Sequence, residues 1–307
     1  MNKKEPSMRI LVAGCEGFLG SYLVSALCEK KNVKVFGISK SKFSKQLNDH
    51  QFYSIDVTKH KRLFEVIELV KPNILINTIA YTDVDLCEIN QEKAFLTNVE
   101  FLNEIKKAID PEKTKLIHIS TDQIFDGKSK FYKETDLTSP INYYGKSKLL
   151  AEKICKEIKN SVIIRTNFIG WSQNKKKITF LNWLFSTLAT DGHVKMFNDV
   201  YFSPIEVSKF SETILNLMAS PFSGLINISG KDRVSKYEFG KLIANEFGYD
   251  SKSIIPISVS DLKLNARRQK DLSLSNYKFE KLFNTTAPGI NDLLRSIKIN
   301  YYKYGNI

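Results

Sequence analysis

The sequence predicts an α/β fold, in which helices cover both faces of a doubly wound parallel sheet and a smaller C-terminal lobe follows. Three observations lead to this prediction. Segments typical of buried strands alternate with segments typical of amphipathic helices over residues 1–165. A glycine-rich turn joins the first strand to the first helix. Polar residues end one strand after another, and in an open α/β sheet that edge holds the ligand.

The first strand and helix flank the glycine turn. Residues 10–13 are apolar, Gly14, Gly17 and Gly20 follow at three-residue spacing, and the next helix is apolar-periodic as far as Leu27. The first glycine allows a sharp turn, the second lets a pyrophosphate approach the backbone, and the third lets the helix pack close to the sheet. N–H groups of the first helical turn then face the phosphates. Three glycines also occur in simple tight turns, but the flanking strand and helix favour a dinucleotide site.

The second and third strands bear on the choice of cofactor. Residues 34–38 lead into Ser39 and Lys40, where a site for NAD normally has an acidic residue. Lys40 would attract the 2′-phosphate of NADPH, so NADPH is preferred while NADH stays possible; the alternative is one more surface lysine. Residues 51–57 form the third strand, and its Asp56 either accepts from an adenine amino group or caps the helix that follows.

The fourth and fifth strands bring polar side chains to the same edge. Residues 74–78 form the fourth strand, and the segment 79–85 after it is small and polar. A helix over 91–108 leads to the fifth strand, 115–119, which ends in Ser120-Thr121-Asp122. We expect both segments to line the ligand edge.

A tyrosine and a lysine open the next helix. Tyr144 and Lys148 are four residues apart, so on a helix they lie on one face. A phenol with a pKa of about 10 is a weak acid, and a nearby ammonium lowers that pKa and eases proton transfer. Thr121 could donate a hydrogen bond to the same developing alkoxide. A helix start with an aromatic residue and a surface lysine is the plainer alternative, but the glycine turn and the Ser-Thr strand end favour catalysis.

The chain changes character after a sixth strand at 161–165. A polar excursion over 172–178, with Lys175–Lys177, precedes a further helix. A smaller substrate-binding lobe is expected to begin here, which gives domains of 1–165 and 166–307, with a segment near 199–219 returning to the first. Arg267 and Arg268 lie in a predicted loop, where they either bind a diphosphate or form a solvated basic surface.

Composition excludes several classes of protein. The net charge is +13, but only seven of the 46 basic residues are Arg, and no aromatic-basic motif of an RNA-binding module is present, so we expect no nucleic-acid partner. No apolar run approaches the about 20 residues of a membrane span, and a cytoplasmic protein without a membrane partner is expected. The four Cys and four His are scattered, so no metal site is predicted.

Several stretches resemble a known family. The glycine turn, STDQIFDG at 120–127 and SPINYYGKSKLLAE at 139–152 are similar to extended short-chain dehydrogenase/reductases with a Rossmann fold, and most closely to dTDP-4-dehydrorhamnose reductase and its sugar-nucleotide relatives. The similarity covers most of the chain. It implies hydride transfer from a nicotinamide to C4 of a nucleotide-linked 4-keto-6-deoxy sugar, in deoxysugar synthesis for surface polysaccharide.

The resemblance also implies roles for single residues. Tyr144 would be the proton donor, Lys148 would hold the nicotinamide ribose and tune the tyrosine, and Thr121 would orient the keto oxygen. Three departures leave the identity of the sugar open: Phe168 replaces a usual indole, Gln123 a usual tyrosine, and Arg268-Gln269 a usual Arg-Pro. No Glu follows Thr121-Asp122, which argues against the related 4,6-dehydratases.

The predicted site therefore has three parts, and two alternatives stay open. The catalytic residues are Thr121, Tyr144 and Lys148. The cofactor would contact Gly14, Glu16, Gly17, Phe18, Leu19, Gly20, Ser39, Lys40, Asp56, Val57, Thr78, Ile79, Ala80, Tyr144 and Lys148. The sugar nucleotide would contact Thr82, Val84, Asp122, Gln123, Phe168, Arg267 and Arg268. An epimerase of the same fold, or a regulatory subunit that binds NADP without chemistry, are the alternatives, and a homodimer is a possible assembly.

Overall fold

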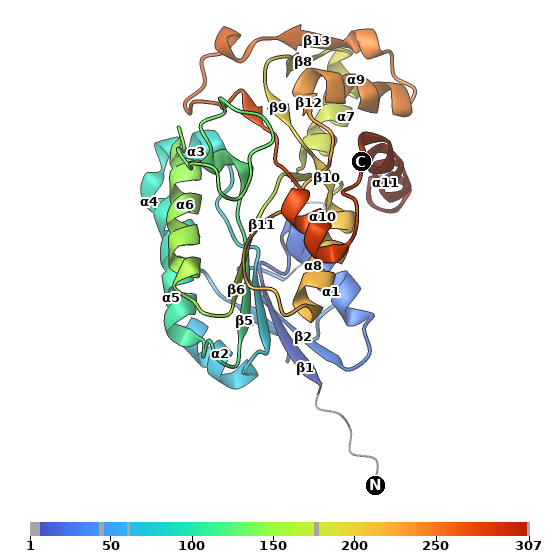
Figure 1. The fold of residues 1–307 in the computed structure, drawn as a ribbon. Coiled ribbons are helices and arrows are strands. Elements are labelled where there is room, and N and C mark those ends of the chain that lie inside the picture. The colour runs from blue at the N-terminus through green and yellow to red at the C-terminus, as the bar shows by residue number, and fades with distance from the viewer. Residues whose placement is uncertain (1–6, 43–45, 60–61, 175–177, 306–307) are drawn as a thin grey trace.

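The computed structural model of the chain describes residues 7–42, 46–59, 62–174 and 178–305, and within them a central sheet of seven strands (Figure 1). The strand order is β11-β6-β5-β4-β1-β2-β3, and every neighbouring pair is parallel. The strands are β1 (Met8–Ala13), β2 (Val33–Ser39), β3 (Phe52–Ser54), β4 (Ile74–Asn77), β5 (Lys115–Ile119), β6 (Ser161–Arg165) and β11 (Gly224–Asn227). The predicted doubly wound sheet is confirmed, with its order reversing at β1.

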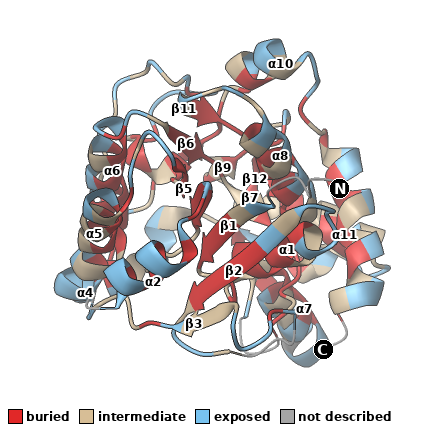
Figure 2. Cartoon of the chain, turned by 90° about the horizontal axis from the view of Figure 1, so that it is seen from below, coloured by how far each residue is buried: buried red, intermediate tan, exposed pale blue. Residues whose placement is uncertain are grey.

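Helices cover both faces of the sheet. One face packs against α1 (Phe18–Cys28) and α8 (Val207–Ala219), and the other against α2 (Leu63–Val70), α5 (Phe101–Ala108) and α6 (Tyr143–Lys156) (Figure 1). Successive residues of a strand point to opposite faces of the sheet, and helices cover both faces. The central strands are therefore apolar without alternation. Figure 2 shows these strands buried along most of their length.

Three local predictions differ from the structure. The third strand is short, because Asp56 turns the chain by accepting hydrogen bonds from Thr58 N and Oγ1. The small and polar segment at 79–85 runs into α3 (Val84–Ile89), a helix that was not predicted and that Asp83 caps. The single helix expected over 91–108 is α4 (Gln91–Phe95), a π-helical turn (Leu96–Glu100) and α5.

The C-terminal lobe has a core of its own, built around Trp171. Its main elements are α7 (Phe180–Asp191), β8 (Val194–Phe197), β9 (Tyr201–Phe202), β12 (Val234–Ser235), α9 (Lys236–Glu246), β13 (Ile254–Ile257), β14 (Asp271–Leu272) and α11 (Ile290–Tyr304). Lys175–Lys177 of the predicted polar excursion lie outside the described residues. The lobe stands over the carboxyl ends of the sheet strands (Figure 1).

Parts of the second half of the chain lie against the sheet. Helix α8 packs on α1, and β11 pairs with β6 as an edge strand that the sequence reading did not predict. Short β7 (Phe168–Ile169) and β10 (Ile205–Glu206) pair with each other, and α10 (Tyr277–Phe283) contacts β11. The division into domains at residue 165 stays a prediction. In the described ranges, every helix is too short or too polar to cross a bilayer.

Candidate active site

A cleft of about 320 Å³ lies at the carboxyl ends of β4 and β5. It is bounded by the start of α1, by α6 and by the segment that follows β6. Its lining residues are Leu19, Thr78, Ala80, Thr82, Ile119, Ser120, Thr121, Asp122, Gln123, Tyr144, Lys148, Thr166, Asn167 and Phe168. All except Ile119, Ser120, Thr166 and Asn167 belong to the predicted site. The three predicted catalytic residues therefore line one cavity together.

The glycine turn borders this cleft and is tightly folded. Gly14 has φ +89°, and a Cβ there would lie 2.5 Å from Thr78 Oγ1. A Cβ on Gly20 would lie 2.0 Å from Gly14 O, so the start of α1 can approach the turn only without a side chain. Gly17 is the N-cap of α1, and this helix has neither a side-chain cap nor an acidic residue in its first turn. The helix N-terminus suits an anion, and the turn fits the pyrophosphate of a dinucleotide.

Lys40 and Asp56 form an ion pair at the far end of the predicted cofactor site. Lys40 Nζ lies 3.2 Å from Asp56 Oδ2, and the lysine side chain is 80% exposed. Hydrogen bonds from Thr58 and from Lys40 lower the pKa of Asp56 to about 2. Exposed pairs contribute about 0–1 kcal/mol, so Lys40 can leave Asp56 for a phosphate at little cost. Val57 follows directly, whereas Ser39 lies at the end of β2.

Helix α6 brings Tyr144 and Lys148 to the cleft. Asn142 caps the helix by accepting from Gly145 N, and Glu88 of α3 accepts from Tyr143 N. Both predicted catalytic side chains are buried, and they share one helix face as the spacing indicates. The lysine ammonium does not contact the phenol. Lys148 Nζ donates to Ile119 O at 2.7 Å and lies 3.1 Å from His118 Nε2.

Burial dominates the acidity of both groups. It raises the pKa of Tyr144 well above 10, against a hydrogen bond with Thr121 that lowers it. Burial also lowers the pKa of Lys148 to about 8. The expectation that Lys148 lowers the pKa of the phenol is therefore wrong for this structure, because the lysine nitrogen is bound to the β5 side. The phenol keeps its proton at neutral pH and can serve as a general acid.

Thr121 connects the phenol to a buried carboxylate. Thr121 Oγ1 donates to Asp122 Oδ1 at 3.0 Å, accepts from Gln123 N, and is also a hydrogen-bond partner of the Tyr144 hydroxyl. Asn167 Nδ2 donates to Asp122 Oδ2 at 2.6 Å. Burial raises the pKa of Asp122, while these hydrogen bonds oppose the rise. Thr121 and Asp122 thus form an ordered polar wall opposite Tyr144.

The C-terminal lobe supplies a cation that sequence reasoning missed. Lys236, the first residue of α9, acts electrostatically on Asp122, and its Nζ lies 3.3 Å from the centre of the Phe202 ring. Desolvation lowers the pKa of Lys236, and the carboxylate opposes this. In the sequence, the capping box of Ser235 and Glu238 predicts where this helix starts. It does not show that Lys236 acts on Asp122, which lies 114 positions earlier in the chain.

A buried ion pair behind the cleft was also missed. Arg165 on β6 binds Glu152 on α6 through Nε and Nη2, at 3.0 and 2.8 Å from the two carboxylate oxygens. Ser120 Oγ donates to Glu152 Oε1 at 2.6 Å. Both charged side chains are almost fully buried, so each depends on the other for its solvation. The pair holds Ser120, and with it the strand end that carries Thr121, against α6.

The loop 266–270 reaches back from the lobe to the nucleotide-binding side. Arg268 Nη2 lies 2.5 Å from Asp85 Oδ2, so this predicted diphosphate ligand already has a carboxylate partner. The Arg267 side chain is exposed, and its carbonyl accepts from Asn142 Nδ2. Buried Gln269 donates to Gln123 O at 2.9 Å and to Phe125 O at 3.2 Å. Asn142 Nδ2 also lies within hydrogen-bond distance of the side-chain oxygens of Gln123 and Gln269.

Of the remaining predicted residues, Phe168 lines the cleft and the others do not. Phe168 lines the cleft and stacks against Phe210, with Phe18 of α1 at 5.4 Å between ring centres. Val84 starts α3 and Ile79 follows β4, and neither lines the cleft. Glu16 is buried within the turn before α1. The individual roles of all these residues stay predictions.

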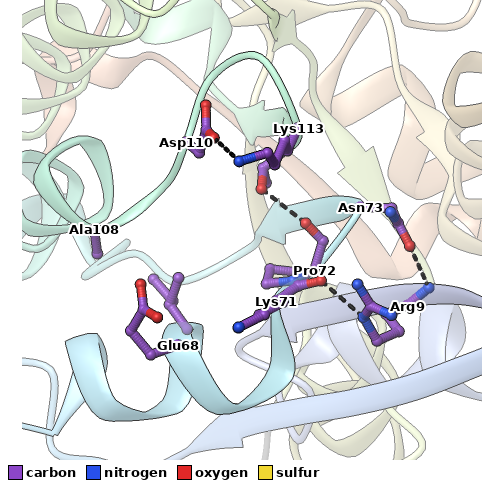
Figure 3. A pocket seen from close by; sticks show the side chains of 10 residues that line it. Arg9, Glu68, Lys71, Pro72, Asn73, Ala108, Asp110 and Lys113 are labelled. Carbon is purple, nitrogen blue, oxygen red and sulfur yellow. Dashed lines mark hydrogen bonds and ion pairs between the residues drawn. The ribbon is translucent and has the colours of Figure 1, made fainter.

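A second pocket, of about 500 Å³, lies at the amino ends of β1, β4 and β5, and Figure 3 shows the residues that line it. Several of its polar side chains already have hydrogen-bond or ion-pair partners within the chain: Arg9 Nε donates to Lys71 O, Thr114 Oγ1 donates to Pro72 O, and Lys113 pairs with Asp110. It holds none of the predicted catalytic groups. Over the described residues, no three His, Cys, Asp or Glu side chains gather as metal ligands.

Comparison with known proteins supports the resemblance found in the sequence. The probable low-salt glycan biosynthesis reductase Agl14 of Haloferax volcanii is 29% identical over 303 residues, which is 97% of this chain and 100% of that protein. A structure described as a hypothetical dTDP-4-dehydrorhamnose reductase from Sulfolobus tokodaii is 32% identical, with a TM-score of 0.81 over 93% of this chain and 98% of that one.

A further structure agrees in fold. The dTDP-4-dehydrorhamnose reductase of Bacillus anthracis, solved in complex with NADP, has a TM-score of 0.83 and 24% identity over 96% of this chain and 99% of that one. Residues 8–300 match the family described as the RmlD substrate binding domain, and this chain belongs to that family.

Proposed function

We propose that this chain is an oxidoreductase that uses NADPH to reduce the C4 keto group of a nucleotide-linked 4-keto-6-deoxy sugar. The observation that carries the proposal is the convergence of Thr121, Tyr144 and Lys148 on one cleft beside the glycine turn. A binding-only protein would not need a buried phenol, a buried lysine and a hydroxyl to meet there.

The residues of the cleft divide the work between them. Bound NADPH would supply the hydride. Tyr144 gives its proton to the oxygen that becomes the C4 hydroxyl, a step that typically contributes about 10²–10⁴-fold to rate. The Thr121 hydroxyl turns from Asp122 Oδ1 to donate to the same oxygen and holds it in line with the phenol. Lys148 would hold the nicotinamide ribose with the N–H that its buried partners leave over. Because its nitrogen does not contact the phenol, it would return a proton to Tyr144 by way of a hydroxyl group bound between them.

The fit of the cofactor rests on this chain's own backbone and charges. The first turn of α1 faces the pyrophosphate, and Gly14 and Gly20 leave the space that it needs. Lys40 supports NADPH over NADH, because its charge is exposed and only weakly committed to Asp56. The Bacillus anthracis structure, which has the same fold, holds NADP.

The substrate would lie between the cleft and the lobe. Asp122, Gln123 and Phe168 line that side of the cleft, and Lys236 brings a positive charge from the lobe. Two of the compared structures are described as dTDP-4-dehydrorhamnose reductases, one of them hypothetical, and the Haloferax relative as a probable glycan biosynthesis reductase. A thymidine-linked keto sugar destined for a surface polysaccharide is therefore the first substrate to test.

The test is NADPH oxidation, followed by absorbance, with thymidine-, GDP- and UDP-linked 4-keto-6-deoxy sugars. We expect stoichiometric NADPH loss and a C4 alcohol with one of them, and no oxidation with the corresponding 4-hydroxy sugars. An epimerase would instead recycle a tightly held NAD without net NADPH loss, and a regulatory subunit would bind NADP without turnover. Either result would overturn the proposal. The cytoplasmic location and a homodimer stay predictions.

A further inference from the structure

A buried histidine lies directly behind the catalytic lysine. His118 on β5 is 0% exposed and is the register partner of Asn77 on β4, so the two side chains lie next to each other beneath α6. Leu75 and Leu116, two residues earlier on the same strands, belong to the apolar core of that face. Buried polar groups are costly unless they are hydrogen-bonded, and this pair sits where apolar residues would pack.

The hydrogen bonds around His118 determine which ring nitrogen carries the proton. Ile79 N donates to Asn77 Oδ1 at 3.1 Å, which fixes the orientation of the amide. Asn77 Nδ2 therefore faces His118 Nδ1, at 3.2 Å, and donates to it. Burial and the charge of Lys148 lower the pKa of His118 well below 6.5, so the ring is neutral. A neutral ring that accepts at Nδ1 carries its hydrogen on Nε2.

The Nε2–H group points at the lysine nitrogen. His118 Nε2 lies 3.1 Å from Lys148 Nζ, and Lys148 Nζ lies 2.7 Å from Ile119 O. A neutral amine can satisfy both partners, because its lone pair accepts from His118 and one N–H donates to Ile119. Its second N–H remains for the cleft. An ammonium would set N–H against N–H, unless the ring moves its proton to Nδ1 and loses the bond from Asn77.

We propose that His118, with its tautomer set by Asn77, positions Lys148 and stabilises the deprotonated form of that lysine. This inference rests on the proposed function, in which Lys148 passes a proton to Tyr144 after the phenol has protonated the keto oxygen. His118 gains its hydrogen bond at the moment when that proton leaves, which makes Lys148 a stronger acid near neutral pH. The low pKa of Lys148, about 8, agrees with this role.

Other ionisable groups around Lys148 act in different directions. Glu152 and Cys155 on α6 raise its pKa, and Arg165 on β6 offsets the charge of Glu152. Tyr144 itself, Cys87 and Glu88 from α3, and Asp122 also lie close to the start of α6. His118 is the neutral partner in hydrogen-bond contact with the lysine nitrogen.

The first test needs no variant and no sugar. The protein contains four histidines, and ¹⁵N-histidine NMR distinguishes the two neutral tautomers by the shifts of the ring nitrogens. With NADP⁺ bound, His118 should be the ring that stays neutral as the pH is lowered below about 6.5, and it should be in the Nε2–H form above the titration of Lys148 at about 8. A ring in the Nδ1–H form, or an imidazolium, would overturn the inference.

The second test reverses the tautomer. In Asn77→Asp, one carboxylate oxygen still accepts from Ile79 N and the other accepts from His118 Nδ1–H, so Nε2 becomes an acceptor for a lysine ammonium. The alkaline limb of kcat/KM should then move to about tenfold lower proton concentration. Asn73→Asp, at the exposed position just before β4, is the matched control and should leave the limb in place.

The outcomes separate the inference from the proposed function. A shifted limb with an Nδ1–H signal in Asn77→Asp supports the role of His118. A shifted limb without a tautomer change overturns it, because the new charge alone would explain the shift. If no keto sugar is reduced, the proposed function fails, and the NMR result on wild-type protein still decides the inference. If Asn77→Asp does not fold, that same wild-type spectrum remains decisive.

Discussion

The proposed chemistry depends most on one hydroxyl, that of Tyr144. Burial keeps this phenol protonated, and a hydrogen bond with Thr121 orients it. The nitrogen of Lys148 is bound to Ile119 and His118. In the proposed mechanism Lys148 therefore supplies a proton to the phenol and does not lower the phenol pKa. A group that must give a proton at neutral pH is suited by a raised pKa, provided that the developing phenolate is stabilised when it forms.

Replacing Tyr144 by Phe should remove the proton donor and leave the cavity intact. We expect kcat to fall by about 10²–10⁴-fold, the usual contribution of general acid catalysis, with the NADPH dissociation constant within about twofold of wild type. Stopped-flow turnover and fluorescence titration measure the two quantities. Tyr143→Phe, at the neighbouring position, should keep its activity, and unchanged turnover in Tyr144→Phe would rule out the assigned role.

Lys40 should decide between the two nicotinamide cofactors. Lys40→Ala removes the exposed cation that we assign to the 2′-phosphate, so KM for NADPH should rise by about tenfold, equal to about 1.4 kcal/mol, with KM for NADH nearly constant. Lys42→Ala is the control, because Lys42 pairs with Asp49 and is not assigned to the cofactor. Equal changes for both cofactors would show that Lys40 is only a surface lysine.

At the scale of elements, α6 organises the site. Tyr144, Lys148 and Glu152 follow at four-residue spacing, so one helix face carries the acid, the lysine and the partner of Arg165. The loop 266–270 is bound to the start of this helix through Asn142. Gln123 and Gln269, two departures from the family pattern, meet there: Gln269 donates to Gln123 O, a bond that a proline could not make. That bond goes to the backbone of residue 123, and the two glutamine side chains share Asn142 Nδ2 as a neighbour within hydrogen-bond distance.

The buried ion pair should matter more than any exposed one. Glu152→Gln leaves Arg165 buried without its full counter-charge, and breaking such a pair typically costs about 3–5 kcal/mol. Glu157→Gln, at the end of the same helix, removes an exposed partner of Lys106 and should cost less than about 1 kcal/mol. Urea unfolding of both variants gives the comparison. Equal losses would mean that Glu152 does not hold α6 to β6.

At the scale of the molecule, the charge of +13 is distributed over the surface and is partly paired. Several lysines, among them Lys106, Lys113 and Lys159, form exposed pairs with acidic residues. Such pairs add little to stability. Larger effects on folding are expected from the buried ionisable groups, among them His118, Glu152 and Arg165.

His118 gives the molecule a defined sensitivity to acid. Its pKa is lowered on folding, so below about 6.5 the unfolded chain binds a proton that the folded chain does not, and stability falls as the pH falls. Between pH 7 and pH 5 this linkage should lower the free energy of unfolding by up to about 2 kcal/mol. Urea midpoints should show a smaller loss in His118→Gln than in wild type, and a wild-type loss in His193→Gln, whose side chain is exposed. Identical losses in both variants would contradict this linkage.

The sequence by itself determined the features that depend on neighbouring residues. The glycine spacing predicted the turn and the helix N-terminus. Strand patterns predicted that β1, β2, β4, β5 and β6 exist, and a four-residue spacing placed Tyr144 and Lys148 on one helix face. These are local consequences of backbone geometry and side-chain period. The turn at Asp56 is local too, and its capping role was one of the two alternatives that the sequence left open, whereas the helix that Asp83 caps was not predicted.

Only the tertiary structure decided the contacts that join distant segments. The pairs His118 with Lys148, Glu152 with Arg165, Asp122 with Lys236 and Gln123 with Gln269 bring together side chains from different strands, helices and lobes. Each looks like an ordinary polar residue in the chain. The structure also decided the direction of the Tyr144 pKa shift, because desolvation depends on everything packed around the phenol, while the sequence shows only which charge lies one helical turn away.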